Sequence, residues 1–210
     1  MGVPVVDYAS LTANIIDVPN RAGDTEYAAS TDMFIGLFEK SANRKILSRY
    51  AEMTSTLTTD ADGLVTLPSD FIALRNSNVA NGNLLTSLSM IPQGSVSQVF
   101  RVTTGGDPYY ISISGNQLSA NPPAVRDVTF DYYAKFVGLS VSNTTNWVIL
   151  QHPDYYLWGT LKQAAIYLDD DRLIQKYEAL RQAAEDEIMT LFSMEQYYGN
   201  TGMIMSGATP

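Results

Sequence analysis

The chain has 210 residues, of which 45% are apolar and only 17% are charged, against a norm of about 25% charged residues in globular proteins. Its 13 basic and 22 acidic side chains give a net charge of −9 and a pI near 4.4, which argues against a protein that wraps nucleic acid with a basic surface. There is no cysteine, so disulfide frameworks, cysteine-based zinc clusters and thiol catalysis are excluded.

The N-terminal residues lack the basic start and long apolar core of a signal peptide. No apolar run approaches the ~18 residues that span a bilayer, so we expect a soluble chain without a membrane partner. Residues 76–100, 108–125 and 137–151 contain no Asp, Glu, Lys, Arg or His. Burial in the core explains such stretches, and so does burial against another chain, because the centres of interfaces are depleted in charge.

The N-terminal part is predicted to be helical. A first helix is expected over Tyr8–Ile16, capped by Asp7. A second is expected over Asp32–Ala51, with Thr31 as N-cap, because its apolar residues recur every three or four positions. Cations favour the C-terminal half of a helix, and this half carries Lys40, Arg44, Lys45 and Arg49.

Residues 53–136 are predicted to form a small antiparallel β unit. Thr54–Thr59 and Leu64–Leu67 are rich in β-branched residues, and Asp60–Gly63 is expected to join them as a hairpin turn. Pro92–Phe100 is expected to form a short helix with proline at its first position. Further strands are expected over residues 72–79, 109–113, 117–120 and 128–134.

Helical patterns return after this unit. Residues 147–151 lead into a third long helix, with His152 in the extended conformation of an N-cap, Pro153 at the first position and Asp154 in the first turn. Residues 172–198 are predicted to form the longest helix. Its apolar seam comprises Leu173, Tyr177, Leu180, Ala184, Ile188 and Leu191.

The predicted fold class is α+β: an antiparallel helical bundle with an inserted small antiparallel β domain and an extended C-terminal tail. The expected parts are residues 1–52 for the N-terminal helices, 53–139 for the β insertion, 140–198 for the C-terminal helices and 199–210 for an uncharged, flexible tail.

No catalytic, cofactor-binding or metal-binding set is predicted. His152 is the only histidine and no G-x-S-x-G elbow is present, so a structural role for His152 is favoured over nucleophilic catalysis. A hairpin turn is favoured over a calcium loop at Asp60–Gly63. Phosphate-binding glycine motifs are missing from the sequence, whereas a pair of carboxylates that meet only in space stays open.

Two charged clusters and the tyrosines are candidate contact residues. The cations between Lys40 and Arg49 suit DNA, an acidic partner or solvent, and the patch Glu185, Asp186 and Glu187 of the same or an adjacent subunit would complement them. Tyrosine suits both a core and an interface. Those of the last helical region are Tyr155, Tyr156, Tyr167, Tyr177, Tyr197 and Tyr198.

Several short motifs, in order, resemble the head-to-tail adaptor (connector or neck) proteins of tailed bacteriophages. The resemblance covers most of residues 30–195. It rests on Arg44–Arg49, Leu67-Pro68-Ser69-Asp70-Phe71 with the residues to Arg75, Pro108–Tyr110, Phe130–Ala134, Asn143–Trp147, His152–Tyr156 and Ala164–Asp170.

The resemblance implies a non-enzymatic virion protein of the neck, made in the host cytoplasm. It implies a ring of about twelve copies below the portal, which links the portal to tail nozzle, tube or fibre proteins and lets DNA pass without sequence-specific binding. Leu67–Phe71 would shape the β insertion, and Trp147 with His152–Asp154 would fix the start of the third long helix. A tail tube or nozzle component and a carbohydrate-binding or carbohydrate-active virion protein remain alternatives.

The resemblance also implies that the C-terminal segment docks into the portal. Methionine adapts to irregular apolar pockets, and an uncharged tail can become ordered on binding. The docking residues expected on this basis are Tyr197, Tyr198, Met203, Ile204 and Met205. A ring of acidic subunits would also repel DNA phosphate, so the genome would pass without adhering.

Overall fold

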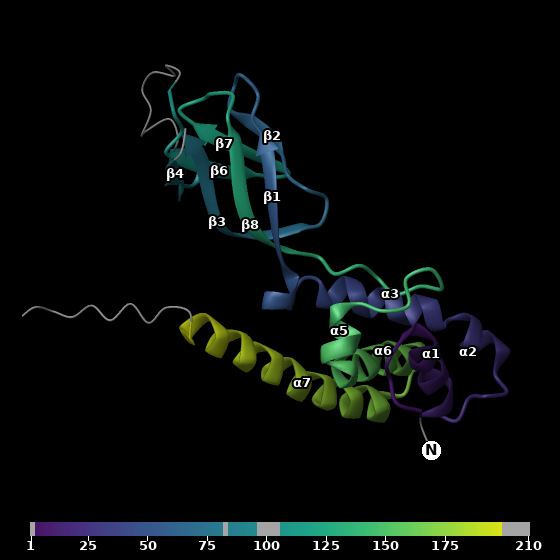
Figure 1. Cartoon of the computed structure of the whole chain (residues 1–210). Coiled ribbons are helices and arrows are strands. Elements are labelled where there is room, and N and C mark those ends of the chain that lie inside the picture. Colours follow the sequence, from purple (N-terminus) through teal and green to yellow (C-terminus); the bar gives the residue numbers. More distant parts are fainter. Residues whose placement is uncertain (1–2, 82–83, 96–105, 199–210) are drawn as a thin grey trace, which may run out of the picture. The chain divides into compact units, whose positions relative to one another are not determined.

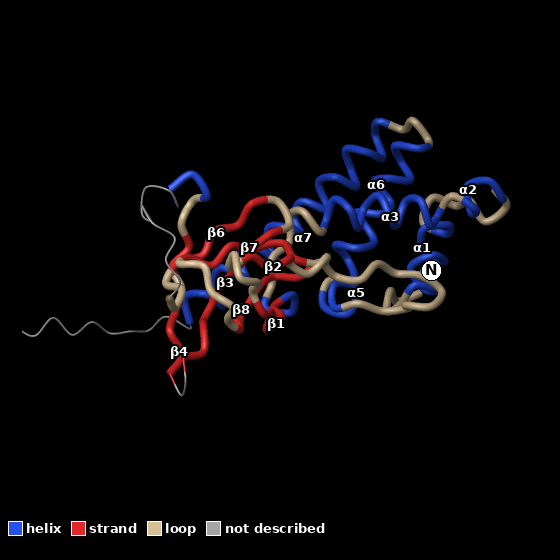
Figure 2. The backbone as a smooth tube through the Cα atoms, turned by 90° about the horizontal axis from the view of Figure 1, so that it is seen from above, coloured by secondary structure: helices blue, strands red, loops and turns tan. Residues whose placement is uncertain are grey.

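A computed structural model describes residues 3–81, 84–95 and 106–198. The chain divides into two compact units. The helical unit comprises the residues up to Tyr50 together with those from Phe136 onward, and the β unit comprises Ala51–Lys135. Figures 1 and 2 show that the described α-helices belong to the first unit and the strands to the second. The mixed α+β class is therefore confirmed, but the β part is larger than the small insertion that we expected.

Within the described residues, the helical unit contains six α-helices. Asp7 caps the first of them, since its Oδ1 accepts the backbone N–H of Ser10 at 2.8 Å, which confirms the prediction. The helices are α1 (Tyr8–Asp17), α2 (Thr25–Ala29), α3 (Thr31–Ala42), α5 (Trp147–Gln151), α6 (Pro153–Tyr167) and α7 (Asp171–Tyr198), and a short 3-10 turn, η1, covers Arg49–Ala51.

The prediction for the second helix was wrong at both ends. The cap position is Ser30, with Thr31 already helical, and the helix ends at Ala42 rather than Ala51. After that point Asn43 uses its side-chain Oδ1 to accept the backbone N–H of Phe136 at 2.9 Å. Ile46 still reaches the core, with 2% of its surface exposed. Ile46 is thus buried by the turn after α3, and not by a continuing helix as its spacing suggested.

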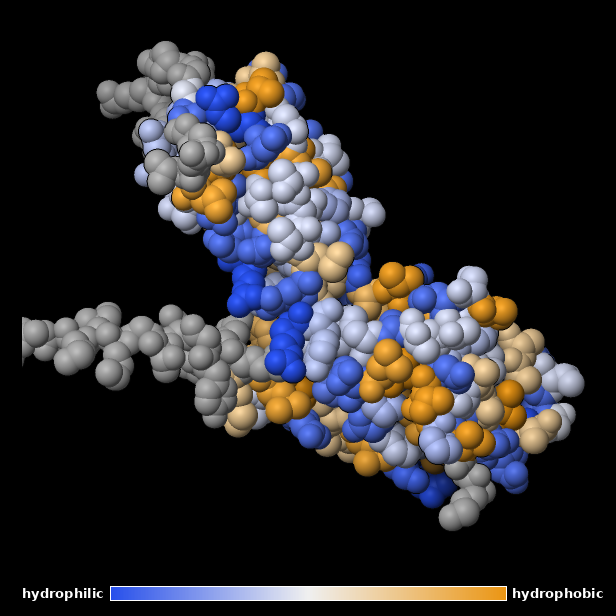
Figure 3. Space-filling model, in the orientation of Figure 1, coloured by the Kyte–Doolittle hydropathy of each residue, from blue (hydrophilic) through white to orange (hydrophobic). Residues whose placement is uncertain are grey.

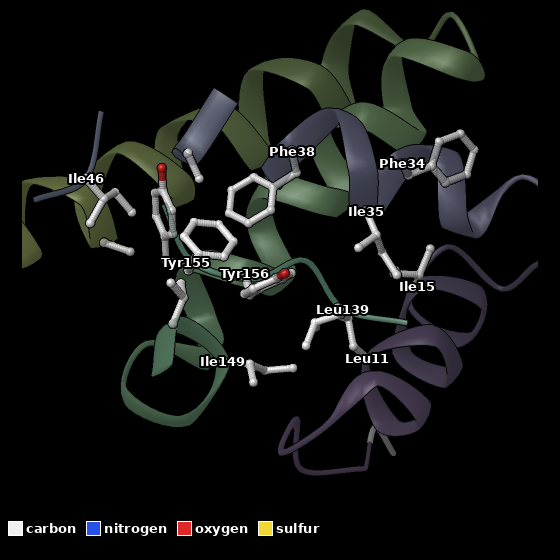
Figure 4. Packing of buried hydrophobic residues seen from close by; sticks show 14 of the residues in the cluster. Leu11, Ile15, Phe34, Ile35, Phe38, Ile46, Leu139, Ile149, Tyr155 and Tyr156 are labelled. Atoms are coloured by element: carbon white, nitrogen blue, oxygen red, sulfur yellow. The ribbon is translucent and has the colours of Figure 1, made fainter. Parts of the chain in front are cut away.

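The core of the helical unit is centred on α6, which contacts α1, α3, α5 and α7. Figure 4 shows the Phe38 ring of α3 facing the rings of Tyr155 and Tyr156, with centroids 5.1 and 5.0 Å apart. Such tilted aromatic pairs add to the free energy gained from burial. Gly159 permits this close approach, because a Cβ there would overlap the Phe38 ring.

The β unit contains two four-stranded sheets, with strand orders β1-β8-β3-β4 and β2-β7-β6-β5. Side chains of both sheets, among them Phe130 and Ile111, form one buried cluster. The strands are β1 (Glu52–Thr58), β2 (Leu64–Thr66), β3 (Phe71–Asn81), β4 (Leu84–Ser87), β5 (Ser89–Met90), β6 (Tyr110–Ser114), β7 (Gln117–Asn121) and β8 (Asp127–Ala134).

The predicted hairpin between the first two strands was wrong. Asp60 and Gly63 do form a turn, with Gly63 at φ 73°. However, β1 pairs with β8 and β2 pairs with β7, so the turn carries the chain from one sheet to the other. The unit is also not purely antiparallel, because β5 and β6 pair in parallel.

Two further predicted segments lie partly or wholly outside the described residues. A 3-10 turn, η2, covers Gln93–Ser95, within the expected short helix, whose remaining residues 96–100 lie outside the described residues. The expected tail, residues 199–210, lies outside them as well. None of the helices in the described ranges combines the length and apolar character that a bilayer span needs.

Candidate functional site

The predicted cation cluster surrounds the end of α3. Lys40 lies in the last helical turn, Arg44 and Lys45 in the turn that follows, and Arg49 in η1; all four are exposed. Because the helix ends at Ala42, these side chains do not form the helical face that their spacing suggested.

Lys45 is joined to the predicted acidic patch within the same chain. Its Nζ lies 3.5 Å from Oε1 of Glu185 on α7. Glu185 also accepts a hydrogen bond from Arg181, which in turn donates from Nε to Glu178 Oε2 at 2.8 Å. Lys162 of α6 completes the network, with Nζ 3.0 Å from the same Glu178 oxygen. We call these five residues the α7 ion network; it ties α6, α7 and the turn after α3 together.

The network shifts the pKa values of two of its members and of the neighbouring Tyr155. Hydrogen bonds from Arg181, supported by Lys162, lower the pKa of Glu178 from 4.5 to about 2. The Glu178 carboxylate correspondingly raises the pKa of Arg181. Burial and the nearby Glu185 raise the pKa of Tyr155 to about 12. Glu178 and Arg181 are therefore charged at neutral pH, and the Tyr155 hydroxyl remains protonated.

The other two acidic candidates differ from Glu185. Asp186 and Glu187 are exposed on α7, whereas Glu185 is half-buried within the ion network. The structure therefore divides the predicted patch into one carboxylate that holds the helical unit together and two that face solvent.

The C-terminal half of α7 keeps apolar side chains at the surface. Leu191 and Met194 are 47% and 51% exposed, although Leu191 belongs to the predicted seam. Figure 3 shows apolar residues exposed between polar ones on the visible face of the helical unit. Tyr197 and Tyr198 are the last two residues of α7, and Met203, Ile204 and Met205 lie outside the described residues.

A hollow lies beside this part of α7. We call it the α7 groove; its volume is about 300 Å³, comparable to the smaller ligand pockets of proteins. It combines a cation and a histidine with apolar side chains. It is lined by Ser48, Arg49, Tyr50, Gln151, His152, Ile188, Leu191 and Phe192.

The start of α6 has the predicted order of residues, but the predicted extended conformation of His152 was wrong, because its backbone has φ −135° and ψ 61°. His152 occupies the N-cap position, Pro153 begins the helix and Asp154 lies in the first turn. The His152 side chain makes no capping hydrogen bond; its ring meets that of Trp147 edge-on at 6.5 Å. Trp147 also stacks on Tyr50, with ring centroids 6.1 Å apart. This aromatic group therefore connects α5 with η1.

Sequence reasoning missed a polar cluster between α3 and the segment that precedes α5. Glu39 accepts hydrogen bonds from the Leu139 backbone N–H at 2.7 Å and from the Tyr156 hydroxyl. Asn146 caps α5 by accepting the Ile149 N–H at 3.0 Å, and donates to the Val137 carbonyl at 2.9 Å. Burial, with Glu39 nearby, raises the pKa of Tyr156. Asn146 before a helical run was a readable cap signal, whereas nothing local marked Glu39.

The Leu67–Phe71 motif lies in the β unit. Leu67 is buried in its core, and the Phe71 N–H donates to the Pro68 carbonyl at 3.1 Å, which turns the chain between β2 and β3. The Asp70 carboxylate accepts the Tyr132 hydroxyl of β8 at 3.2 Å. Phe71 stacks on the same tyrosine with centroids 5.6 Å apart. The motif thus fixes the end of β8 against the turn.

These arrangements tie elements together rather than converge on one reactive point. In the part of the chain that the structure describes, no group of three His, Cys, Asp or Glu side chains is placed to hold a metal ion. Of the predicted cations, Lys45 contacts Glu185, whereas the Leu67–Phe71 motif belongs to a separate unit.

Comparison with known proteins agrees with a structural protein. The sequence model of the family described as "SU10 adaptor protein" matches residues 6–203, which includes both units. A search of curated proteins finds no match. Because the match extends over nearly the whole chain, this protein belongs to the SU10 adaptor protein family, a family of phage head-to-tail adaptors.

Proposed function

We propose that the protein is a head-to-tail adaptor that forms a ring of about twelve copies below the portal of a tailed phage. In this role it links the portal to tail components, continues the DNA channel and lies in the neck of the virion. The observation that carries the proposal is the family match over residues 6–203.

The C-terminal end of the chain is the proposed portal-docking part. Leu191 and Met194 expose apolar surface on the last described turns of α7, and Tyr197 and Tyr198 follow. Aromatic residues and methionine are enriched in protein interfaces. The uncharged segment with Met203, Ile204 and Met205 extends this composition.

Sedimentation of the protein alone and mixed with the portal ring of the same virus tests the proposal. The expected result is saturation at one copy per portal subunit. A chain that remains monomeric and ignores the portal would contradict the adaptor role and favour a distal tail component, and polysaccharide binding would then be measured.

Removal of residues 199–210 tests the docking segment separately. The shortened chain should keep its far-UV circular dichroism and thermal unfolding but lose portal binding. Undiminished binding would transfer the docking role to the helices or to the β unit, and would leave the adaptor role intact.

The acidic surface of α7 is the proposed contribution to the channel wall. Asp186 and Glu187 are exposed, and their negative charges would repel the negatively charged phosphates of DNA. D186N combined with E187Q should slow DNA ejection, while D17N combined with D62N removes the same charge from exposed positions outside α7 and should not. Equal ejection rates for the two double variants would contradict this role of α7.

A further inference from the structure

The two sheets of the β unit end in edges of very different length. In the sheet β2-β7-β6-β5, the edge strands β2 and β5 have three and two residues. In the other sheet, β1 is an edge strand of seven residues. Figure 1 shows β1 and β4 on opposite sides of β8 and β3 in that sheet. Short edges limit unwanted pairing, and a long one needs another protection.

β1 lacks the usual devices that protect an edge. Its register with β8 runs without a shift from Glu52 to Thr58, so no bulge distorts it. It contains no proline, lysine or arginine. Its single charge, on Glu52, is paired with Arg75 of β3. Its threonines favour extended structure, so β1 is a regular template for a further strand, with its one charge at its first residue.

The hydrogen-bond pattern shows which groups β1 presents at its free edge. The Thr59 N–H donates to the Arg126 carbonyl at 2.9 Å. Since bonded pairs alternate along an antiparallel ladder, Thr54, Thr56 and Thr58 direct their backbone N–H and C=O groups away from β8. Their hydroxyls are already used on the face of the sheet, where they bond to Asp131, Thr129 and Asp127.

The opposite edge of the same sheet is complementary. The Leu88 N–H donates to the Ser77 carbonyl at 2.9 Å, so by the same alternation Leu85 and Ser87 of β4 direct their backbone groups outward. These two residues are uncharged, and Leu85 is 72% exposed. All neighbours in the sheet are antiparallel, so a β4 strand placed beside β1 would continue the alternation of strand directions.

We infer that β1 of one copy pairs with β4 of the next, so that one antiparallel sheet continues from subunit to subunit. The inference rests on the proposed ring and names one of its contact surfaces. A contact between two different edges is heterologous, and heterologous contacts repeat around a ring until it closes. Each copy then uses both of its exposed edges, and Leu85 packs beside the methyl groups of the β1 threonines.

Proline at position 56 tests the backbone contact. The Thr56 N–H points away from β8, so proline there leaves the intrachain ladder in place but removes an outward donor. T56V is the matched control, because it also loses the hydroxyl and keeps the N–H. With unchanged circular dichroism in both, T56V should sediment as the wild-type ring and T56P should lose the ring mass. Ring formation by T56P equal to that of T56V would overturn the inference.

Thiol cross-linking tests the partner, since the chain has no cysteine of its own. T56C/L85C and T56C/S87C test the two registers in which Thr56 lies opposite one of the outward residues of β4. Treated with a short bis-maleimide, one of them should give covalent products longer than dimers, whereas T56C, L85C and S87C alone should not. An intact ring without such products would overturn the sheet contact and leave the adaptor proposal standing; a wild-type chain that forms no ring would overturn both.

Discussion

At the scale of single residues, two glycines of the helical unit have opposite surroundings. A Cβ at Gly159 would overlap the Phe38 ring, whereas a Cβ at Gly36 of α3 would meet nothing within 4 Å. We expect G159A to lower the free energy of unfolding by about 1–3 kcal/mol through overpacking, and G36A to raise it by about 0.5–1 kcal/mol through lower backbone entropy in the unfolded chain.

Tryptophan fluorescence in denaturant measures both effects, because the two tryptophans, Trp147 and Trp158, belong to the helical unit. Equal stability of G159A and G36A would contradict the close approach of α3 and α6.

Glu178 gives the helical unit a dependence on pH. Its pKa is about 2 in the folded chain, against 4.5 without its partners, so folding favours its ionised form. This contribution to stability is complete above about pH 4.5 and is lost as the pH falls toward 2. We expect E178Q to flatten the decline of the denaturation midpoint over that range. E187Q, which removes an exposed carboxylate of the same helix, should keep the wild-type slope; a similar flattening in E187Q would contradict a special role of the network.

At the scale of elements, Asn146 determines where α5 begins and how the preceding segment is held. N146A removes both the cap on Ile149 and the bond to the Val137 carbonyl, and should lower stability by about 1 kcal/mol or more. N146D keeps an acceptor for the cap and loses only the donor, so its loss should be smaller. Thermal unfolding followed by fluorescence ranks the three proteins; an N146D as unstable as N146A would show that the cap contributes little.

The elements also show what sequence patterns can predict. The capped start of α1 and the Pro153 start of α6 were predictable because their signals are local. The end of α3 was not, because Asn43 makes its decisive bond with Phe136, 93 residues later. Thr54–Thr59 and Leu64–Leu67 had the composition of a hairpin, but their partners are β8 and β7, which local pattern cannot reveal. The contact of Lys45 with Glu185 was foreseen only as complementary charge.

At the scale of the whole molecule, the β unit has the organisation of an independent domain. Its core lies entirely within residues 51–135, and Glu52 and Tyr133 face each other across β1 and β8, so the unit begins and ends at neighbouring points. We expect residues 51–135, produced alone, to give a dispersed NMR spectrum and one cooperative unfolding transition. A spectrum typical of an unfolded chain would show that the helical unit is needed to stabilise it.

The helical unit is built from two sequence segments that the β unit separates, and this has a consequence for synthesis on the ribosome. The contact between Glu39 and Tyr156 joins residues 117 positions apart, and the whole β unit is translated between them. The apolar face of α3, with Phe34 and Phe38, therefore emerges long before the helix that covers it. At about 5–20 residues per second, this face is exposed for several seconds in every nascent chain. That interval makes α3 the segment of the newborn protein that a chaperone would be expected to cover.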